Sequence, residues 1–234
     1  MLVKLAQLAA DFPQLRELDL NPLLADQDGV LAVDTRVAIA PVDDVRRGPP
    51  GHPRFAIRPY PNEWERPVML RDGTAILIRP IRPEDEALYA PFFAQVNDED
   101  LRLRFFAPIK EFSHAFVARL TQLDYARAMA FIAIEGASGA MLGVGRLHAN
   151  ANYDTAEYAV LVRSDMKGHG LGWLLMQTMI DYAGAEGLQM IEGQVLRDNT
   201  TMLTMCRELG FEISADPHDA DLCVVKLKVP KRSP

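Results

Sequence analysis

A glycine-rich turn at positions 162–172, with the sequence VRSDMKGHGLG, is the feature best suited to chemistry. An apolar stretch leads into the turn, and apolar residues from Leu171 to Tyr182 then recur at the spacing of one helix face. The first amides of a helix have no partners within it, and glycines let an anion come close to them. The turn therefore fits a diphosphate, although the glycines alone fit equally well a tight turn that binds no ligand.

One carboxylate, Glu157, stands in the apolar stretch TAEYAVLV that precedes the turn. A charged residue in such a strand faces either solvent or a cleft, and solvent is the more common case for an isolated residue. In a cleft, the same carboxylate can remove a proton from a substrate. The other candidates are weaker, because His148 fits a surface or core position and His114, beside Ser113, fits the start of a helix.

The elements that must position these residues alternate along the chain. A hairpin turns at Asp72-Gly73, and helices open at Pro83 and after Ser113, a plausible N-cap. Hairpin strands followed by a strand–helix–strand–helix–strand series predict the α/β (α+β) class, with a mixed, mostly antiparallel sheet flanked by helices. The predicted elements are strands 68–70 and 75–79, helices from 83 and over 113–123, strands 128–134, 141–148 and 155–162, helix 171–185, strand 189–195, helix 200–209 and closing strands to 229.

The turn is similar to the acetyl-CoA signature of the GNAT superfamily, Gln/Arg-x-x-Gly-x-Gly/Ala. Lys167 occupies the first position, where Gln or Arg is usual, and Gly170 and Gly172 occupy the glycine positions. A second GNAT signature, Asn-x-x-Ala-x-x-x-Tyr-x-x-x-Gly-Phe, is matched in spacing by Asn199, Met202, Cys206, Gly210 and Phe211. Each of these residues is weak evidence alone, since Asn199 also fits a helix N-cap and Gly210 a glycine that ends a helix. The two signatures together predict the GNAT fold.

The resemblance implies a site for acetyl-CoA and no metal. Main-chain amides of the turn would hold the diphosphate, and the strand before it would pair with the pantetheine arm, in the splay between strands 157–162 and 189–195. The His169 side chain is expected near the phosphates without being essential. The cofactor-binding residues implied are Val160, Leu161, Val162, Lys167, Gly168, His169, Gly170, Leu171, Gly172 and Asn199.

Acetyl transfer to lysine needs a base, because a free amine with a pKa of about 10.4 is protonated at neutral pH. In GNAT enzymes the general base is often a Glu in this strand, so the resemblance implies that Glu157 is catalytic. Many members also use a Tyr as general acid at the position of Cys206, where a small buried residue is the expected role of the thiol. We therefore expect direct attack without a dedicated acid, and no acyl-enzyme on Cys206 or Cys223.

Residues 1–40 predict a helix, a strand, a turn at 26–29 and a single returning strand. They resemble the end of the ATP-grasp region of NDP-forming acyl-CoA synthetases. In intact members Glu17, Asp19 and Asn21 would lie in the metal-nucleotide region. So little of that fold remains that we expect neither ATP nor Mg²⁺ binding, and the piece is interpreted as an inactive remnant.

Seven prolines between positions 41 and 67 predict a stiff, extended linker over residues 41–66, which Trp64 anchors to the following domain at 67–229. This order of parts resembles bacterial protein lysine acetyltransferases in which a synthetase-like region is fused to a GNAT domain, as do the stretches 72–85 and 102–106. The resemblance implies a protein substrate, with an acyl-CoA synthetase as a candidate. It also implies that most of the regulatory region is missing, so unregulated activity is expected.

Two alternatives stay open. The chain fits a GNAT enzyme that acetylates a small-molecule amine or a protein N-terminus, and it fits a non-catalytic module that senses acyl-CoA. A net charge of −7 argues against nucleic acid as the main partner, and no apolar run approaches the ~20 residues that cross a membrane. The two cysteines have no metal or redox spacing, so a cytoplasmic location is expected. The oligomeric state is left open.

Overall fold

The structure, a computed structural model, describes residues 2–12, 15–27, 29–39, 58–107 and 112–230. The chain divides into two compact units, residues 1–61 and 62–234. All the helices and strands predicted for the second unit form, with bounds close to the predicted ones. Among the described residues, no helix is both long enough and apolar enough to cross a membrane.

The second unit is built on one eight-stranded sheet in the order β11-β12-β10-β9-β8-β7-β6-β5. Neighbouring strands are antiparallel except β9 and β10, which run parallel because a helix connects them. The predicted mixed, mostly antiparallel sheet is thus confirmed. The strands are β5 (Arg66–Met69), β6 (Ala75–Pro80), β7 (Ala128–Glu135), β8 (Met141–Ala149), β9 (Thr155–Val162), β10 (Met190–Leu196), β11 (Glu212–Ala215) and β12 (Leu222–Lys228).

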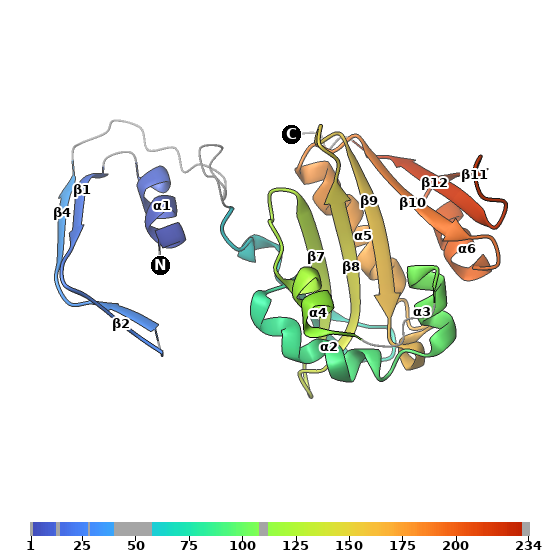
Figure 1. Cartoon of the computed structure of the whole chain (residues 1–234), viewed down its shortest axis with the longest axis horizontal. Coiled ribbons are helices and arrows are strands. Elements are labelled where there is room, and N and C mark those ends of the chain that lie inside the picture. Colours follow the sequence, from blue (N-terminus) through green and yellow to red (C-terminus); the bar gives the residue numbers. More distant parts are fainter. Residues whose placement is uncertain (1, 13–14, 28, 40–57, 108–111, 231–234) are drawn as a thin grey trace. The chain divides into compact units, whose positions relative to one another are not determined.

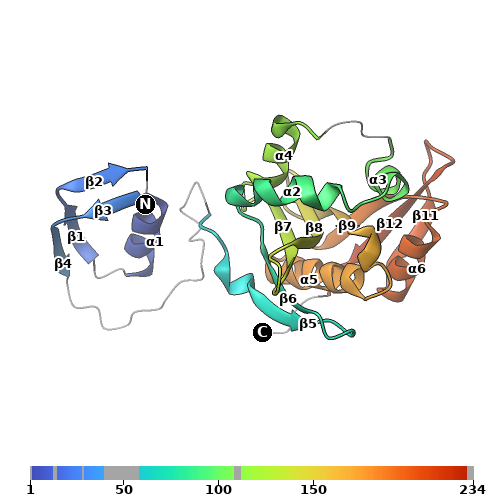
Figure 2. The ribbon, with the colours of Figure 1, turned by 90° about the horizontal axis from the view of Figure 1, so that it is seen from below.

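Helices cover both faces of this sheet (Figures 1 and 2). One face packs on α5 and α6 and the other on α2, α3 and α4, each over its own cluster of buried apolar side chains. This three-layer arrangement explains why β7, near the middle of the sheet, is apolar from Ala128 to Ile134. The helices are α2 (Glu86–Phe93), α3 (Asp98–Phe105), α4 (His114–Thr121), α5 (Leu171–Ala185) and α6 (Thr200–Glu208), with 3-10 turns η1 (Asn62–Trp64), η2 (Pro83–Asp85) and η3 (Ser164–Met166).

Helix α3 is absent from the predicted elements. Its sequence, DEDLRLRF, lacks the apolar spacing of an amphipathic helix. Its first turn is instead defined by a cap, because the Asn97 side chain accepts a hydrogen bond from the Asp100 amide at 2.8 Å. Acidic residues fill the first turn and basic residues the last, which suits the helix dipole. Capping and charge therefore specify this helix where apolar periodicity does not.

The first unit contains α1 (Leu2–Asp11) and two small two-stranded sheets, β1 with β4 and β2 with β3. The prediction of a single returning strand is wrong. The returning segment is divided into β3 and β4 at Val33 and Asp34, and the opposite arm is divided into β1 and β2 at the same level. The register is unchanged across this break, because Leu20 lies opposite Thr35 and Leu23 opposite Ala32, and the Val33 amide still donates to the Pro22 carbonyl at 3.1 Å. The strands are β1 (Leu15–Leu20), β2 (Leu23–Asp26), β3 (Gly29–Ala32) and β4 (Thr35–Ile39).

The predicted turn at 26–29 is supported by the Gly29 amide, which donates to Asp26 Oδ1 at 3.0 Å, while Asp28 lies outside the described residues. Most of the predicted linker, positions 41–57, also lies outside them. The end of the linker is anchored as predicted. Trp64 packs against Phe131 and Tyr182, with ring centroids 5.8 and 5.3 Å from its own.

Candidate active site

A groove opens where strands β9 and β10 separate. The two strands pair only from Thr155 opposite Met190 to Glu157 opposite Glu192. A groove of about 660 Å³ adjoins the unpaired part of β9, with further walls from α3, the turn before α5, β10 and the start of α6. This volume lies in the range of cofactor and small-molecule sites. The gap in the sheet is therefore large enough for an extended ligand.

The free edge of β9 offers main-chain groups to the groove. In register with this strand, the Arg163 amide donates to the Leu142 carbonyl at 2.9 Å, so odd-numbered residues of β9 exchange hydrogen bonds with β8. Val160 and Val162 consequently direct their amides and carbonyls toward the opposite edge, where β10 no longer pairs. A ligand with amide groups of its own can pair with this edge as an added strand does.

The turn before α5 presents unpaired amides. Gly168 and Gly170 have φ values of 82° and 83°, a left-handed conformation that side chains disfavour and that turns the chain into α5. The amides of residues 167–172 donate no hydrogen bond to any described residue. Nothing lies within 4 Å of a Cβ placed on either glycine. Open, unpaired amides at a helix N-terminus fit a diphosphate group.

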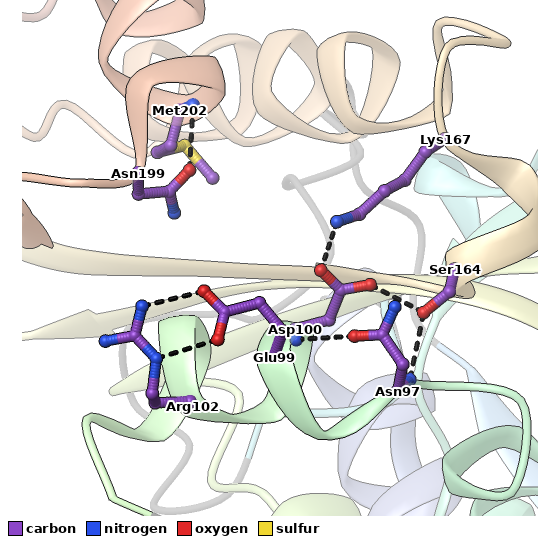
Figure 3. Close-up of polar contacts among 8 residues, drawn as sticks. All are labelled: Asn97, Glu99, Asp100, Arg102, Ser164, Lys167, Asn199 and Met202. Carbon is purple, nitrogen blue, oxygen red and sulfur yellow. Dashed lines mark hydrogen bonds and ion pairs between the residues drawn. The ribbon is translucent and has the colours of Figure 1, made fainter.

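A buried carboxylate joins α3 to this turn (Figure 3). Lys167 Nζ donates to Asp100 Oδ1, and Ser164 Oγ donates to Asp100 Oδ2 at 2.5 Å. The Asn97 amide in turn donates to Ser164 Oγ at 2.9 Å. The Asp100 side chain is only 5% exposed, so these charge-assisted bonds are shielded from water. They hold the turn in one position relative to α3.

Helix α3 also contacts the loop before α6. Arg102 forms ion pairs at 2.7 Å with Glu99, on its own helix (Figure 3), and with Asp198. The Asn199 side chain accepts a hydrogen bond from the Met202 amide at 3.1 Å and caps α6, which confirms the predicted N-cap. Both helices contribute walls to the groove, and the ion pair between Arg102 and Asp198 lies outside its lining.

Glu157 lines the groove at the last residue before the strands separate. Its side chain is exposed and has no hydrogen bond or ion pair with a described residue. Its register partners are His148 on β8 and Glu192 on β10, and Glu192 is held by Lys226 at 3.3 Å. Glu157 is therefore available to accept a proton from a group in the groove.

Cys206 is fully buried, as the sequence analysis expected. Burial raises the pKa of its thiol, so the thiolate is disfavoured at neutral pH. Its Sγ lies 3.2 Å from the hydroxyl of Tyr158, a contact that spacing along the sequence did not reveal. Burial and then the neighbouring Cys206 raise the pKa of Tyr158, so this hydroxyl also keeps its proton. Neither group is a ready source of protons for a leaving group.

The structure brings almost every predicted site residue to one groove. His169 is the exception, because its ring does not line the groove and its Nδ1 lies 2.6 Å from Asp72 Oδ2 on the β5–β6 turn. The lining residues that were predicted are Glu157, Val160, Leu161, Val162, Lys167, Gly168, Gly170, Leu171, Gly172 and Asn199.

Sequence reasoning missed the wall made by α3. Asp100 and Arg104 line the groove from this helix, and Gln194 lines it from β10. The stretch 102–106 carries a usable signal, because it resembles the corresponding stretch of the GNAT fusion proteins. It assigns no role to Asp100 or Arg104, because apolar spacing does not predict α3.

The fold and the groove define an acyl-CoA-dependent N-acyltransferase. Residues 75–212 match the family model described as the acetyltransferase (GNAT) domain, so the chain belongs to the GNAT acetyltransferases, which use acetyl-CoA as acyl donor. Residues 1–39 match the model of an ATP-grasp domain.

Similar proteins agree with this assignment. The chain is 32% identical over 160 residues to the acetyltransferase PA5475 of Pseudomonas aeruginosa, covering 68% of this chain and 86% of that protein. It is 31% identical over 147 residues to the acetyltransferase Pat of Mycolicibacterium smegmatis, covering 62% of this chain but only 43% of Pat. The crystal structure of the GNAT domain of S. lividans PAT aligns with a TM-score of 0.67 at 28% identity, covering 73% of this chain and 99% of that domain.

Proposed function

We propose that this enzyme transfers the acetyl group of acetyl-CoA to the side-chain amine of a protein lysine, with Glu157 as general base. One observation carries the proposal. An exposed carboxylate that forms no hydrogen bond or ion pair with a described residue stands in the groove where β9 loses its neighbouring strand, and amides with no hydrogen bond to a described residue face the same groove. The first group suits removal of a proton and the second suits an anionic, amide-containing donor.

Each part of the groove has a task in this proposal. The amides of residues 167–172 hold the diphosphate, and the edge at Val160 and Val162 orients the arm that carries the thioester. Acetyl-CoA supplies the activated acyl group. Glu157 accepts the proton of the attacking amine, whose nitrogen forms a bond to the acyl carbon as the carbon–sulfur bond breaks. The thiolate that leaves takes a proton from solvent, because Cys206 and Tyr158 are buried and hold theirs.

The need for a base follows from the acceptor. A lysine amine is almost fully protonated at neutral pH, a handicap of roughly 4 kcal/mol for its attack on a thioester. Because Glu157 is exposed, a lysine side chain on the surface of another protein can reach it from solvent, which supports a protein as the acceptor. The similarity to the acetyltransferase Pat supports the same class of acceptor.

Replacing Glu157 with Gln tests the base. General-base catalysis contributes about 10²- to 10⁴-fold, so we expect a loss of that order in kcat/KM for Glu157→Gln with unchanged binding of CoA. The rate of this variant should keep rising with pH, because the deprotonated amine then needs no base. Glu192→Gln is the matched control, since Glu192 is the register partner of Glu157 and does not line the groove. A wild-type rate and pH profile in Glu157→Gln contradicts the assignment.

The acceptor class is tested with radiolabelled acetyl-CoA and a panel of proteins, lysine peptides, polyamines and peptides with only an N-terminal amine. We expect label on lysine side chains of protein. Label only on small amines or N-termini contradicts the protein-lysine proposal. Tight binding of acetyl-CoA with no transfer to any acceptor would instead identify a sensing module.

A further inference from the structure

A second, small cavity adjoins the groove on the face of the sheet that carries α2, α3 and α4. Its volume is about 10 Å³, enough for one water-sized group. It shares Arg104, Ala159 and Leu161 with the groove, so the two spaces meet beside β9. Glu157 stands two residues before Ala159, on the same face of the strand. The small cavity is therefore next to the proposed reaction centre.

The hydroxyl of Tyr89 lies in this cavity beside Arg146. Tyr89 is only 1% exposed, and its Oη is completely shielded from solvent. Among the described residues Arg146 interacts with this hydroxyl, but no hydrogen bond of normal geometry joins the two side chains. A buried hydroxyl without a well-formed hydrogen bond is unfavourable, and a ligand atom in the cavity would complete its bonding.

Two guanidinium groups line the same cavity. Arg146, from β8, donates to the Leu120 carbonyl at 2.6 Å, while Arg104, from α3, has no hydrogen bond or ion pair with a described residue. None of the residues described in the lining carries a carboxylate. Burial and then the charge of Arg146 lower the pKa of Arg104 to about 10, although Glu157 opposes this shift. Two cations thus share a largely apolar space whose described lining has no anionic group, and the attraction of Glu157 reaches Arg104 from the adjoining groove. A carboxylate bound between the two guanidinium groups would relieve this arrangement.

We propose that Tyr89, Arg104 and Arg146 form a subsite for a carboxylate carried by a substrate in the adjoining groove. Guanidinium groups and a hydroxyl are the donors that a carboxylate prefers. One carboxylate oxygen fills the small cavity, and the rest of the substrate stays in the groove. The carboxylate can come from the acyl chain of a dicarboxylic acyl-CoA or from the acceptor, and the donor case rests on the groove being the acyl-CoA site.

Calorimetric titration of the full chain with succinyl-CoA and butyryl-CoA tests the donor case, because their acyl groups have equal carbon numbers and differ in the terminal carboxylate. A charge-assisted hydrogen bond predicts about 10- to 100-fold tighter binding of succinyl-CoA by the wild type. Arg104→Gln and Arg146→Gln should abolish this preference, measured for each variant as the ratio of its dissociation constants for the two thioesters. Tyr89→Phe, which keeps the shape of the core, should reduce the preference.

Arg102→Gln is the matched control on the same helix. Arg102 is ion-paired with Glu99 and Asp198 and lines neither space, so this variant should keep the preference. The acceptor case is tested on the CoA-saturated protein with two lysine peptides that carry Glu or Gln beside the lysine. Tighter binding of the Glu peptide by the wild type but not by Arg104→Gln supports the subsite and assigns the carboxylate to the acceptor.

The proposed subsite is overturned if the wild type binds succinyl-CoA no more tightly than butyryl-CoA and the Glu peptide no more tightly than the Gln peptide. If neither thioester binds, the proposed function fails independently, and free succinate decides the subsite. A larger rise in melting temperature with succinate for the wild type than for Arg104→Gln supports it, whereas equal rises refute it.

Discussion

Replacing Gly172 with Ala tests two properties of α5, its contribution to thermal stability and its contribution to the affinity for CoA. Gly172 is the second residue of α5 and has an ordinary φ, so an alanine fits the backbone. A Cβ there would lie 3.8 Å from Val162 and 4.0 Å from Met205, both normal contacts. Alanine is favoured over glycine in a helix by roughly 0.5–1 kcal/mol. We therefore expect the variant to be more stable than the wild type in the absence of ligand.

The same methyl group should leave ligand binding intact. Val162 and Met205 both line the groove, but the new Cβ meets them at ordinary contact distances. The acetyl-CoA signature that this turn matches has either Gly or Ala at the position of Gly172, so we expect an affinity for CoA close to that of the wild type. Gly170→Ala should behave differently, since a side chain at a φ of 83° costs about 1–2 kcal/mol of stability.

Thermal unfolding without ligand and calorimetric titration with CoA measure the two effects. For a chain of this size, 1 kcal/mol corresponds to about 2–4 °C in the melting temperature, upward for Gly172→Ala and downward for Gly170→Ala. A large loss of affinity for CoA in Gly172→Ala would show that the bound diphosphate leaves no room for a methyl group at this position. A lower melting temperature in Gly172→Ala would show that the start of α5 is packed more tightly than the structure indicates.

Three other predictions concern buried groups. In the native enzyme at pH 8, iodoacetamide should leave Cys206 unmodified, because the raised pKa of its thiol keeps it protonated at this pH. The variant Cys206→Ala should keep the kcat of the wild type. An acetyl group on Cys206 in a quenched reaction would contradict both expectations. Arg79 binds the buried Asp85 carboxylate through hydrogen bonds of 2.6 and 2.7 Å. Asp85→Asn removes the negative charge of this pair, so it should lower the free energy of unfolding, measured in urea, by about 3–5 kcal/mol. Gly193→Ala should cost about 1–3 kcal/mol in the same assay, since its Cβ would meet the Tyr158 ring at 2.6 Å, and a neutral result is incompatible with that packing.

The sequence predicts most of the sheet and the ligand-facing turn because both follow local rules. The face of α5 from Leu171 to Tyr182 repeats at helical spacing, and the glycines before it are required by backbone conformation. The GNAT resemblance then directs attention to Glu157 and to the edge of β9, which the geometry of the groove brings together.

The parts that could not be predicted depend on contacts between distant segments. Helix α3 has no apolar period, so neither its wall of the groove nor the Asp100 contact to Lys167, 67 residues away, follows from local patterns. The contact between Tyr158 and Cys206, 48 residues apart, depends in the same way on how β9 and α6 pack. In the first unit, Val33 and Asp34 look like part of a strand, yet they fall between β3 and β4, opposite the break between β1 and β2.

The separation of β9 from β10 leaves a seam in an otherwise continuous sheet. A bound pantetheine arm would close this seam as a short non-protein strand, so the substrate would complete the secondary structure of the enzyme. Hydrogen–deuterium exchange should then slow at the amides of Val160 and Val162 when CoA binds, while Leu161, bonded to β8, stays protected throughout. In each turnover the donor would thus fill the gap between the two strands, and release of the product would expose the edge of β9 again.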